Sequence, residues 1–229
     1  MGHGRVWCDL GNRARVRNQA KVKLHGWTVM TAAFERQLAC LVEDAREASQ
    51  HYDLYKQIRE AISIEEKIIK MNRAPAFWSL TLNAHLNSCR LGLCRVYDKT
   101  RGSINIDGWL REHRKLLLDK ALEPEIEERH HMSSPVTAST IDSDLALTNE
   151  KNELVKKLSA QRNKAIIHTD RLEAEGLTSV FERFPLTYSN YEELIQRADT
   201  ILNRYSVLYS GAAYQLSVAG RSDVQRVLC

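Results

Sequence analysis

The residues of this chain that are best suited to chemistry lie in one polar block, between Arg162 and Asp170. Within it, Arg162 and His168 stand six positions apart in a region of helical periodicity. A histidine, whose pKa lies near neutrality, can take the proton from a ribose 2′-hydroxyl group or give one to the leaving 5′-oxygen. An arginine can hold two phosphate oxygens in its planar fork and stabilise the charge that grows in the transition state. Such a pair could cleave RNA to a 2′,3′-cyclic phosphate with no metal ion or other cofactor.

The geometry of an ideal helix fits these residues to one site only in part. With about 100° per residue, Arg162 and His168 flank an apolar stripe, and Ala165 between them leaves a concavity for a phosphodiester. The same arithmetic turns Asn163 to the opposite side. Either the helix departs from ideal geometry here or Asn163 is not in the site. On spacing alone, a solvent-facing arginine beside a capping or core histidine is the simpler interpretation.

Four charged residues near the motif each have two possible roles. Lys164, Arg171 and Arg183 could guide an RNA backbone, but single exposed charges are more often solvated surface. Asp170 could cap or end a helix or accept a local hydrogen bond, and this structural role is favoured. The sequence contains no Gly-rich phosphate loop, no Gly-x-Ser-x-Gly elbow and no His-Glu-x-x-His motif.

The sequence predicts neither a metal site nor disulfides. Its five cysteines form an odd set without a Cys-x-x-Cys pair, which suits reduced thiols in the core. His130 and His131 follow Glu127 and Glu128, but a Pro/Ser/Thr-rich stretch without an i,i+4 ligand pair favours a solvated loop. His85 falls within an apolar helical stripe, where a hydrogen-bonded core histidine is favoured over a catalytic one.

Hydrophobic periodicity predicts the elements that would position the motif. Ser-x-x-Glu capping boxes are predicted at Ser63 with Glu66 and at Ser189 with Glu192. Residues 123–141 are predicted to form a long surface connection. The predicted helices run from Ala32 to about Ile62, from Pro75 to Asp98, from Asp107 to Leu117 as a short helix with Asp107 as its cap, from about Ser143 to Thr169, and from Ser189 to about Tyr209.

These helices, with no alternating runs of β-branched residues, predict an all-α fold: a bundle of four long helices with additional short helices. Residues 1–29 are predicted as a basic, disordered arm, residues 30–216 as the helical domain and residues 217–229 as a tail. Six Lys or Arg stand against one Asp in the arm, so the rest of the chain is near neutral. No apolar run is long enough to cross a membrane and no secretory signal is apparent, so a cytoplasmic location is expected.

The motif and its context resemble the HEPN superfamily, and in particular its abortive-infection branch. The superfamily's signature is an arginine, usually followed by a polar residue, and then a histidine after a gap of four to six residues, which Arg162, Asn163 and His168 match. The resemblance spans roughly Ala32 to Tyr214. Similarity to the second helix and following turn of that branch is carried by Phe77-Trp78-Ser79-Leu80, Arg95-Val96-Tyr97-Asp98 and Ile106-Asp107-Gly108-Trp109-Leu110.

This resemblance implies that residues 30–216 are an HEPN-like domain and that the chain is a metal-independent endoribonuclease of the toxin or phage-defence type. The site would form where two protomers of a homodimer pool Arg162 as the phosphate-binding residue and His168 as the acid/base. Asn163 would be the polar residue after the arginine. The partners would be RNA and a second copy of the chain, with an antitoxin or regulatory protein left open.

The sequence departs from one group of relatives at Asp170. HEPN toxins that are paired with a minimal nucleotidyltransferase usually have tyrosine at this place, as the acceptor for inactivating adenylylation, so that form of control is in doubt here. Two other interpretations remain: a catalytically silent HEPN-like module that binds RNA, a nucleotide or a partner protein, and a structural helical adaptor.

Overall fold

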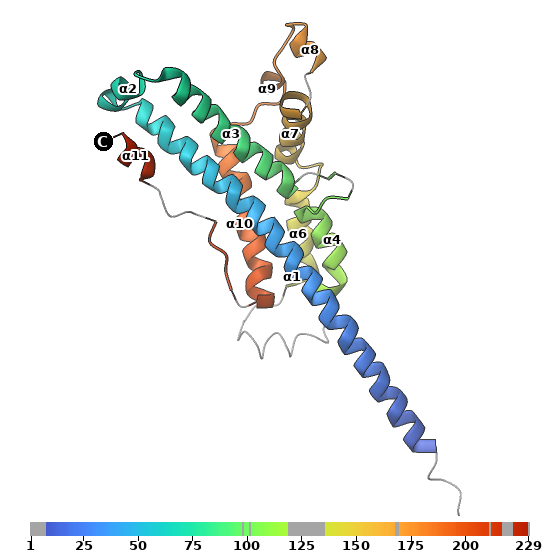
Figure 1. Ribbon diagram of the computed structural model, residues 1–229. Coiled ribbons are helices and arrows are strands. Elements are labelled where there is room, and N and C mark those ends of the chain that lie inside the picture. Colours follow the sequence, from blue (N-terminus) through green and yellow to red (C-terminus); the bar gives the residue numbers. More distant parts are fainter. Residues whose placement is uncertain are drawn as a thin grey trace, which may run out of the picture. The chain divides into compact units, whose positions relative to one another are not determined.

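The computed structural model describes residues 8–97, 99–100, 102–118, 136–167, 170–210, 212–216 and 222–228, and every regular element in these ranges is a helix. The predicted all-α class is therefore confirmed. None of the helices in the described ranges has the length and apolar character needed to span a membrane. In chain order (Figure 1), they are α1 (Cys8–Ile62), α2 (Glu65–Met71), α3 (Pro75–Tyr97), α4 (Ile106–Leu117), α6 (Ala138–Thr148), α7 (Glu153–Gln161), the π-helix η2 (Arg162–Ile167), α8 (Arg171–Ala174), α9 (Val180–Arg183), α10 (Tyr188–Ser210) and α11 (Asp223–Val227).

The first helix ends where its periodicity predicts, at Ile62, but it begins earlier than expected. It is helical from Cys8 rather than from Ala32, and so includes most of the segment for which disorder is predicted from composition. The chain forms two units, residues 1–39 and 40–229. The second unit holds both the motif and the helices that position it.

Within the second unit, α1 and α3 run antiparallel in close contact. The Arg95 Nε donates to Asp44 Oδ1 at 2.8 Å. One turn further along the pair, Gly92 faces Ala48 so closely that a side chain on Gly92 would meet it. The close approach depends on glycine, because any larger residue at that place would separate the two helices.

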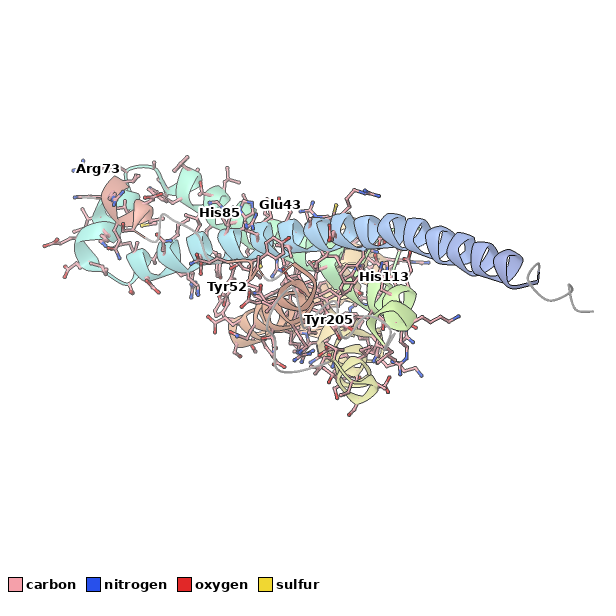
Figure 2. The ribbon with its side chains drawn as sticks, turned by 90° about the horizontal axis from the view of Figure 1, so that it is seen from below. Glu43, Tyr52, Arg73, His85, His113 and Tyr205 are labelled. Carbon is pink, nitrogen blue, oxygen red and sulfur yellow. The ribbon has the colours of Figure 1, made fainter. Side chains whose placement is uncertain are left out.

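The core of this unit is formed where α3, α4, α7 and α10 meet α1. The Trp109 ring lies against Tyr205, with ring centroids 5.5 Å apart, and against His113 at 5.6 Å (Figure 2). The other buried apolar side chains from α3, α4, α7 and α10 include Leu93, Val96, Tyr97, Ile106, Leu110, Val155, Leu158, Tyr191, Leu194, Ala198, Ile201 and Leu202.

We expect the Gly92→Ala substitution to destabilise the protein. The added β-carbon would lie 2.9 Å from the Ala48 β-carbon and 3.2 Å from its backbone. Alanine favours the helix over glycine by about 1 kcal/mol, but overpacking a tight contact costs about 1–3 kcal/mol. The balance should therefore lower the free energy of unfolding, which urea denaturation measures.

The double variant Ala48→Gly, Gly92→Ala provides the matched control. It removes the opposing β-carbon while keeping the new one, so the two substitutions should interact favourably in a double-mutant cycle. A single Gly92→Ala variant that is as stable as the wild type would contradict the close packing of α1 against α3.

The long helix predicted from Ser143 to Thr169 is not continuous, and this prediction is wrong. It is interrupted between α6, which ends at Thr148, and α7, which begins at Glu153. Asn149 donates its side-chain amide to Leu145 O at 2.7 Å, and Asn152 accepts from Leu154 N at 3.2 Å as the cap of α7. Asparagine offers the backbone such alternatives to helical bonding, which is why the helix breaks here.

Both predicted Ser-x-x-Glu capping boxes are wrong. Ser63 donates its hydroxyl to Glu60 O at 2.7 Å, and the cap of α2 is Ile64, which makes no side-chain capping bond. At α10, the reciprocal bonds are made two residues earlier, by Thr187 and Asn190 in place of Ser189 and Glu192. Thr187 N donates to Asn190 Oδ1 at 3.0 Å, and Asn190 N donates to Thr187 Oγ1 at 3.3 Å.

The cap of α4 also differs from the predicted one. Asn105, and not Asp107, accepts from a free backbone group of the first turn, Gly108 N, at 2.9 Å. Asp107 is buried inside that turn and pairs with Lys99 at 2.8 Å and Arg111 at 2.9 Å. Burial acts to raise the pKa of Asp107, but these two cations outweigh it and the pKa lies below its ordinary value.

Candidate active site

Arg162 and Asn163 lie on a π-helix. The α-helix α7 ends at Gln161, and η2 continues from it over Arg162–Ile167. In a π-helix, the backbone hydrogen bonds join residue i to residue i+5, so the turn is wider than in an α-helix. The rotation of about 100° per residue therefore does not apply within it. The helix therefore departs from ideal geometry here, which is one of the two alternatives that the sequence left open.

Within this turn, the side chain of Asn163 contacts that of Arg162. Asn163 Oδ1 accepts from Arg162 Nε at 2.9 Å and from Nη2 at 2.6 Å. A further contact comes from Thr100, between α3 and α4, whose Oγ1 accepts from Arg162 Nη1 at 3.2 Å. These two acceptors are neutral oxygens, and they help to fix the direction of the guanidinium.

A buried polar chain holds the start of η2 in place. Gln161 is 2% exposed; its Nε2 donates to Phe184 O at 2.6 Å and its Oε1 accepts from the Tyr191 hydroxyl at 3.0 Å. Tyr191 in turn accepts from Arg90 Nε at 2.8 Å. Burial raises the pKa of Tyr191, so its hydroxyl stays protonated and remains a donor.

Sequence reasoning missed Gln161. The sequence did contain a signal: Gln161 is polar, but helical periodicity places it on the buried face, where an apolar residue is expected. Because a buried amide must be hydrogen-bonded on both its oxygen and its nitrogen, such a residue fixes two neighbours at once. Here it fixes α10 through Tyr191 and the segment after α9 through Phe184.

Asp170 has the structural role that the sequence favoured. It caps α8, accepting from Leu172 N at 3.0 Å and Glu173 N at 3.4 Å, and it pairs with Arg183 Nη2 at 2.5 Å. Desolvation acts to raise the pKa of Asp170, but the Glu173 N–H group and the Arg183 guanidinium outweigh it. The pKa therefore lies below its usual value, and the carboxylate stays ionised at neutral pH.

The three predicted RNA-binding residues are arranged in two ways. Lys164 and Arg183 meet around Asp170 and the Phe184 ring: Lys164 Nζ is 3.9 Å from Asp170 Oδ2 and 5.4 Å from the ring centroid. Arg183 lies 5.8 Å from the same ring, and its Nε is buried with no hydrogen-bond partner among the described residues. Arg171 is 89% exposed and pairs with Glu175 at 2.6 Å.

Several predicted positions lie outside the described residues. They include His168, so its distance to Arg162 stays a prediction, and also His130, His131 and the Glu127–Glu128 pair. In the part of the chain that the structure describes, no three His, Cys, Asp or Glu side chains are grouped as metal ligands.

The described cysteines are free thiols. Cys89 and Cys94 are buried, as predicted, while Cys40 is exposed. Burial raises the pKa of Cys89 and of Cys94 to about 12, so both stay protonated and neither is a nucleophile at neutral pH.

Comparison with known proteins identifies the family. A sequence model of the HEPN AbiU2 family, described as AbiU2, matches residues 31–227 and so covers most of the chain. Searches among curated proteins and among solved structures gave no match. The matched range includes the motif and the segments that resemble the HEPN superfamily. The chain therefore belongs to the AbiU2 family, and it is a HEPN-type abortive-infection protein.

Proposed function

We propose that this protein is a metal-independent endoribonuclease of the toxin or phage-defence type, with Arg162, Asn163 and His168 in its active site. Family membership supports the class of protein. The observation that carries the proposal is the π-helical turn in which Asn163 and Thr100 orient the Arg162 fork. A guanidinium whose planar fork is held in a fixed direction is suited to a phosphodiester.

In the proposed reaction, His168 takes the proton from the 2′-hydroxyl group, and the 2′-oxygen attacks the adjacent phosphorus. The bond from phosphorus to the 5′-oxygen breaks, and that oxygen receives a proton as it leaves. The products are a 2′,3′-cyclic phosphate and a 5′-hydroxyl group. Arg162 stabilises the charge on the non-bridging oxygens as the transition state forms, while Asn163 orients the guanidinium.

A homodimer completes the proposal. Two copies of the motif would line one groove, so that the His168 of one protomer acts as base while the His168 of its mate acts as acid. Lys164 and Arg183 would contact the RNA backbone beside this groove, since they bring positive charge to one place in each protomer. Arg171 would contribute less, because Glu175 balances its charge, whereas Lys164 and Arg183 share the single carboxylate of Asp170 and keep a net positive charge.

The test is the cleavage of single-stranded RNA by the purified protein in excess EDTA. We expect cleavage to persist and to leave cyclic phosphate and 5′-hydroxyl ends. An RNA of the same sequence that is 2′-O-methylated throughout should remain intact, because it lacks the nucleophile. Products with 5′-phosphate ends, or activity that EDTA removes, would contradict the mechanism. Binding of RNA without any cleavage would favour the silent module in its place.

A further inference from the structure

Two histidines on different helices meet at the contact between α1 and α3. The Nδ1 atoms of His51, on α1, and His85, on α3, are 2.9 Å apart, and their ring centroids are 5.1 Å apart at an interplanar angle of 38°. Figure 2 labels His85 at this contact. The hydrogen bond confirms that His85 is hydrogen-bonded, as predicted, although it is not in the core. Both rings are only half-buried, however, and the motif makes no use of either.

At most one ring of this pair carries a charge. One ring must donate its Nδ1 proton to the lone pair of the other, so two charged rings cannot share this contact. Burial lowers the pKa of His85, and the neighbouring His51 lowers it further. Neutral imidazole is the form that binds transition metals.

The spacing of the two nitrogens matches one coordination geometry. For metal–nitrogen bonds of about 2.0–2.1 Å, two nitrogens at a right angle are about 2.9 Å apart, and two at a tetrahedral angle about 3.4 Å apart. The observed 2.9 Å is the right-angle spacing. Right-angle positions occur in the square-planar and tetragonal sites of Cu²⁺ and Ni²⁺, whereas Zn²⁺ is usually tetrahedral.

The two helices hold this spacing firmly. Gly92 and Ala48 approach so closely that a β-carbon on Gly92 would lie 2.9 Å from that of Ala48, and Arg95 bonds both Asp44 at 2.8 Å and Glu47 across the same pair of helices. The donor atoms are thus brought together before any ion arrives. A preformed pair loses less conformational entropy on binding than two independent side chains would.

We propose that His51 and His85 form a two-nitrogen site for Cu²⁺ or Ni²⁺ that joins α1 to α3, with water in the remaining coordination positions. Each ring binds through Nδ1, so both must carry their proton on Nε2. The proton now shared between the Nδ1 atoms moves to Nε2 through solvent, and no oxidation or reduction takes place. The two rings tilt so that both lone pairs point at one ion, while the helices keep the two Nδ1 atoms close to each other.

The experiment is thermal unfolding of the full chain with and without Ni²⁺. A site that exists only in the folded state should raise the midpoint as Ni²⁺ is added, with a stoichiometry of one ion per chain. His51→Ala and His85→Ala should each lose this rise. Each variant is compared with itself with and without Ni²⁺, so a change in its basal stability cannot mimic the result.

The matched control is the double variant His130→Ala, His131→Ala, which removes the adjacent histidines of the sequence and should keep the full rise. A rise that depends on His130 and His131, or that survives in the His51 and His85 variants, would overturn the proposal. If either single variant fails to fold, the Cu²⁺ electron paramagnetic resonance spectrum of the control variant decides. Coupling to two nitrogens is expected, and coupling to fewer would overturn the site.

Discussion

The His168→Ala variant is expected to cleave single-stranded RNA about 10²–10⁴-fold more slowly than the wild type, which is the usual contribution of a general acid or base. An alanine can neither take the proton from the 2′-hydroxyl group nor return one to the 5′-oxygen. The remaining activity would come from Arg162, which still binds and polarises the phosphate. Single-turnover cleavage of an end-labelled RNA measures the effect on the chemical step.

The control for this variant is His131→Ala, which makes the same substitution at a histidine outside the motif. It should cleave RNA as the wild type does. Equal rates for the wild type, His168→Ala and Arg162→Ala would identify the activity as a contaminant. Circular dichroism of each variant shows whether the bundle is intact, so that loss of folding is separated from loss of chemistry.

A lysine at position 162 is expected to reduce cleavage by about 10²–10³-fold, as the loss of a transition-state donor does in other enzymes. Arg162 uses Nε and Nη2 to bond Asn163 and Nη1 to bond Thr100. A lysine ammonium keeps the positive charge, but it cannot make this planar set of bonds and hold a phosphate in a fixed direction. The loss would therefore be due to geometry, since the charge is unchanged.

Arg226→Lys is the matched control, because Arg226 is 77% exposed on α11 and pairs only with Asp223 at 3.6 Å among its described ion pairs. We expect its activity to be that of the wild type.

Mixing Arg162→Ala protein with His168→Ala protein tests the shared site of the proposed homodimer. A shared site should recover activity in mixed dimers that neither variant has alone. No recovery, in samples shown to exchange protomers, would contradict the pooled site.

The helices that the sequence predicted well are those whose apolar period is unbroken. Ile62 ends α1 as expected, and α3 occupies the predicted range from Pro75, because apolar residues recur at the helical period along both segments. The predicted caps failed where two capping patterns competed. At α10, both Thr187–Asn190 and Ser189–Glu192 offer a side-chain oxygen three residues before a polar side chain, and only tertiary packing decides which pair forms the cap.

The candidate site was predictable in its residue types but not in its geometry. Arg162 and Asn163 could be singled out because a guanidinium and a polar neighbour suit phosphate chemistry. The π-helix on which both lie could not be predicted, because no residue propensity indicates one. The one sign in the sequence was that an ideal α-helix would turn Asn163 to the side opposite the apolar stripe. Gln161 was missed because its role depends on Phe184 and Tyr191, which are remote in sequence.

The break between α6 and α7 determines how the chain can tolerate changes in length. In an unbroken helix, one inserted residue would rotate everything downstream by about 100° and turn the Arg162 fork away from Thr100. Here α7 begins at its own cap, Asn152. A residue added between Asn149 and Asn152 would therefore lengthen the connection without rotating α7 about its axis. The orientation of Arg162 around the helix axis is thus set by the short stretch from Asn152 onward, and the connection upstream can change in length without altering it.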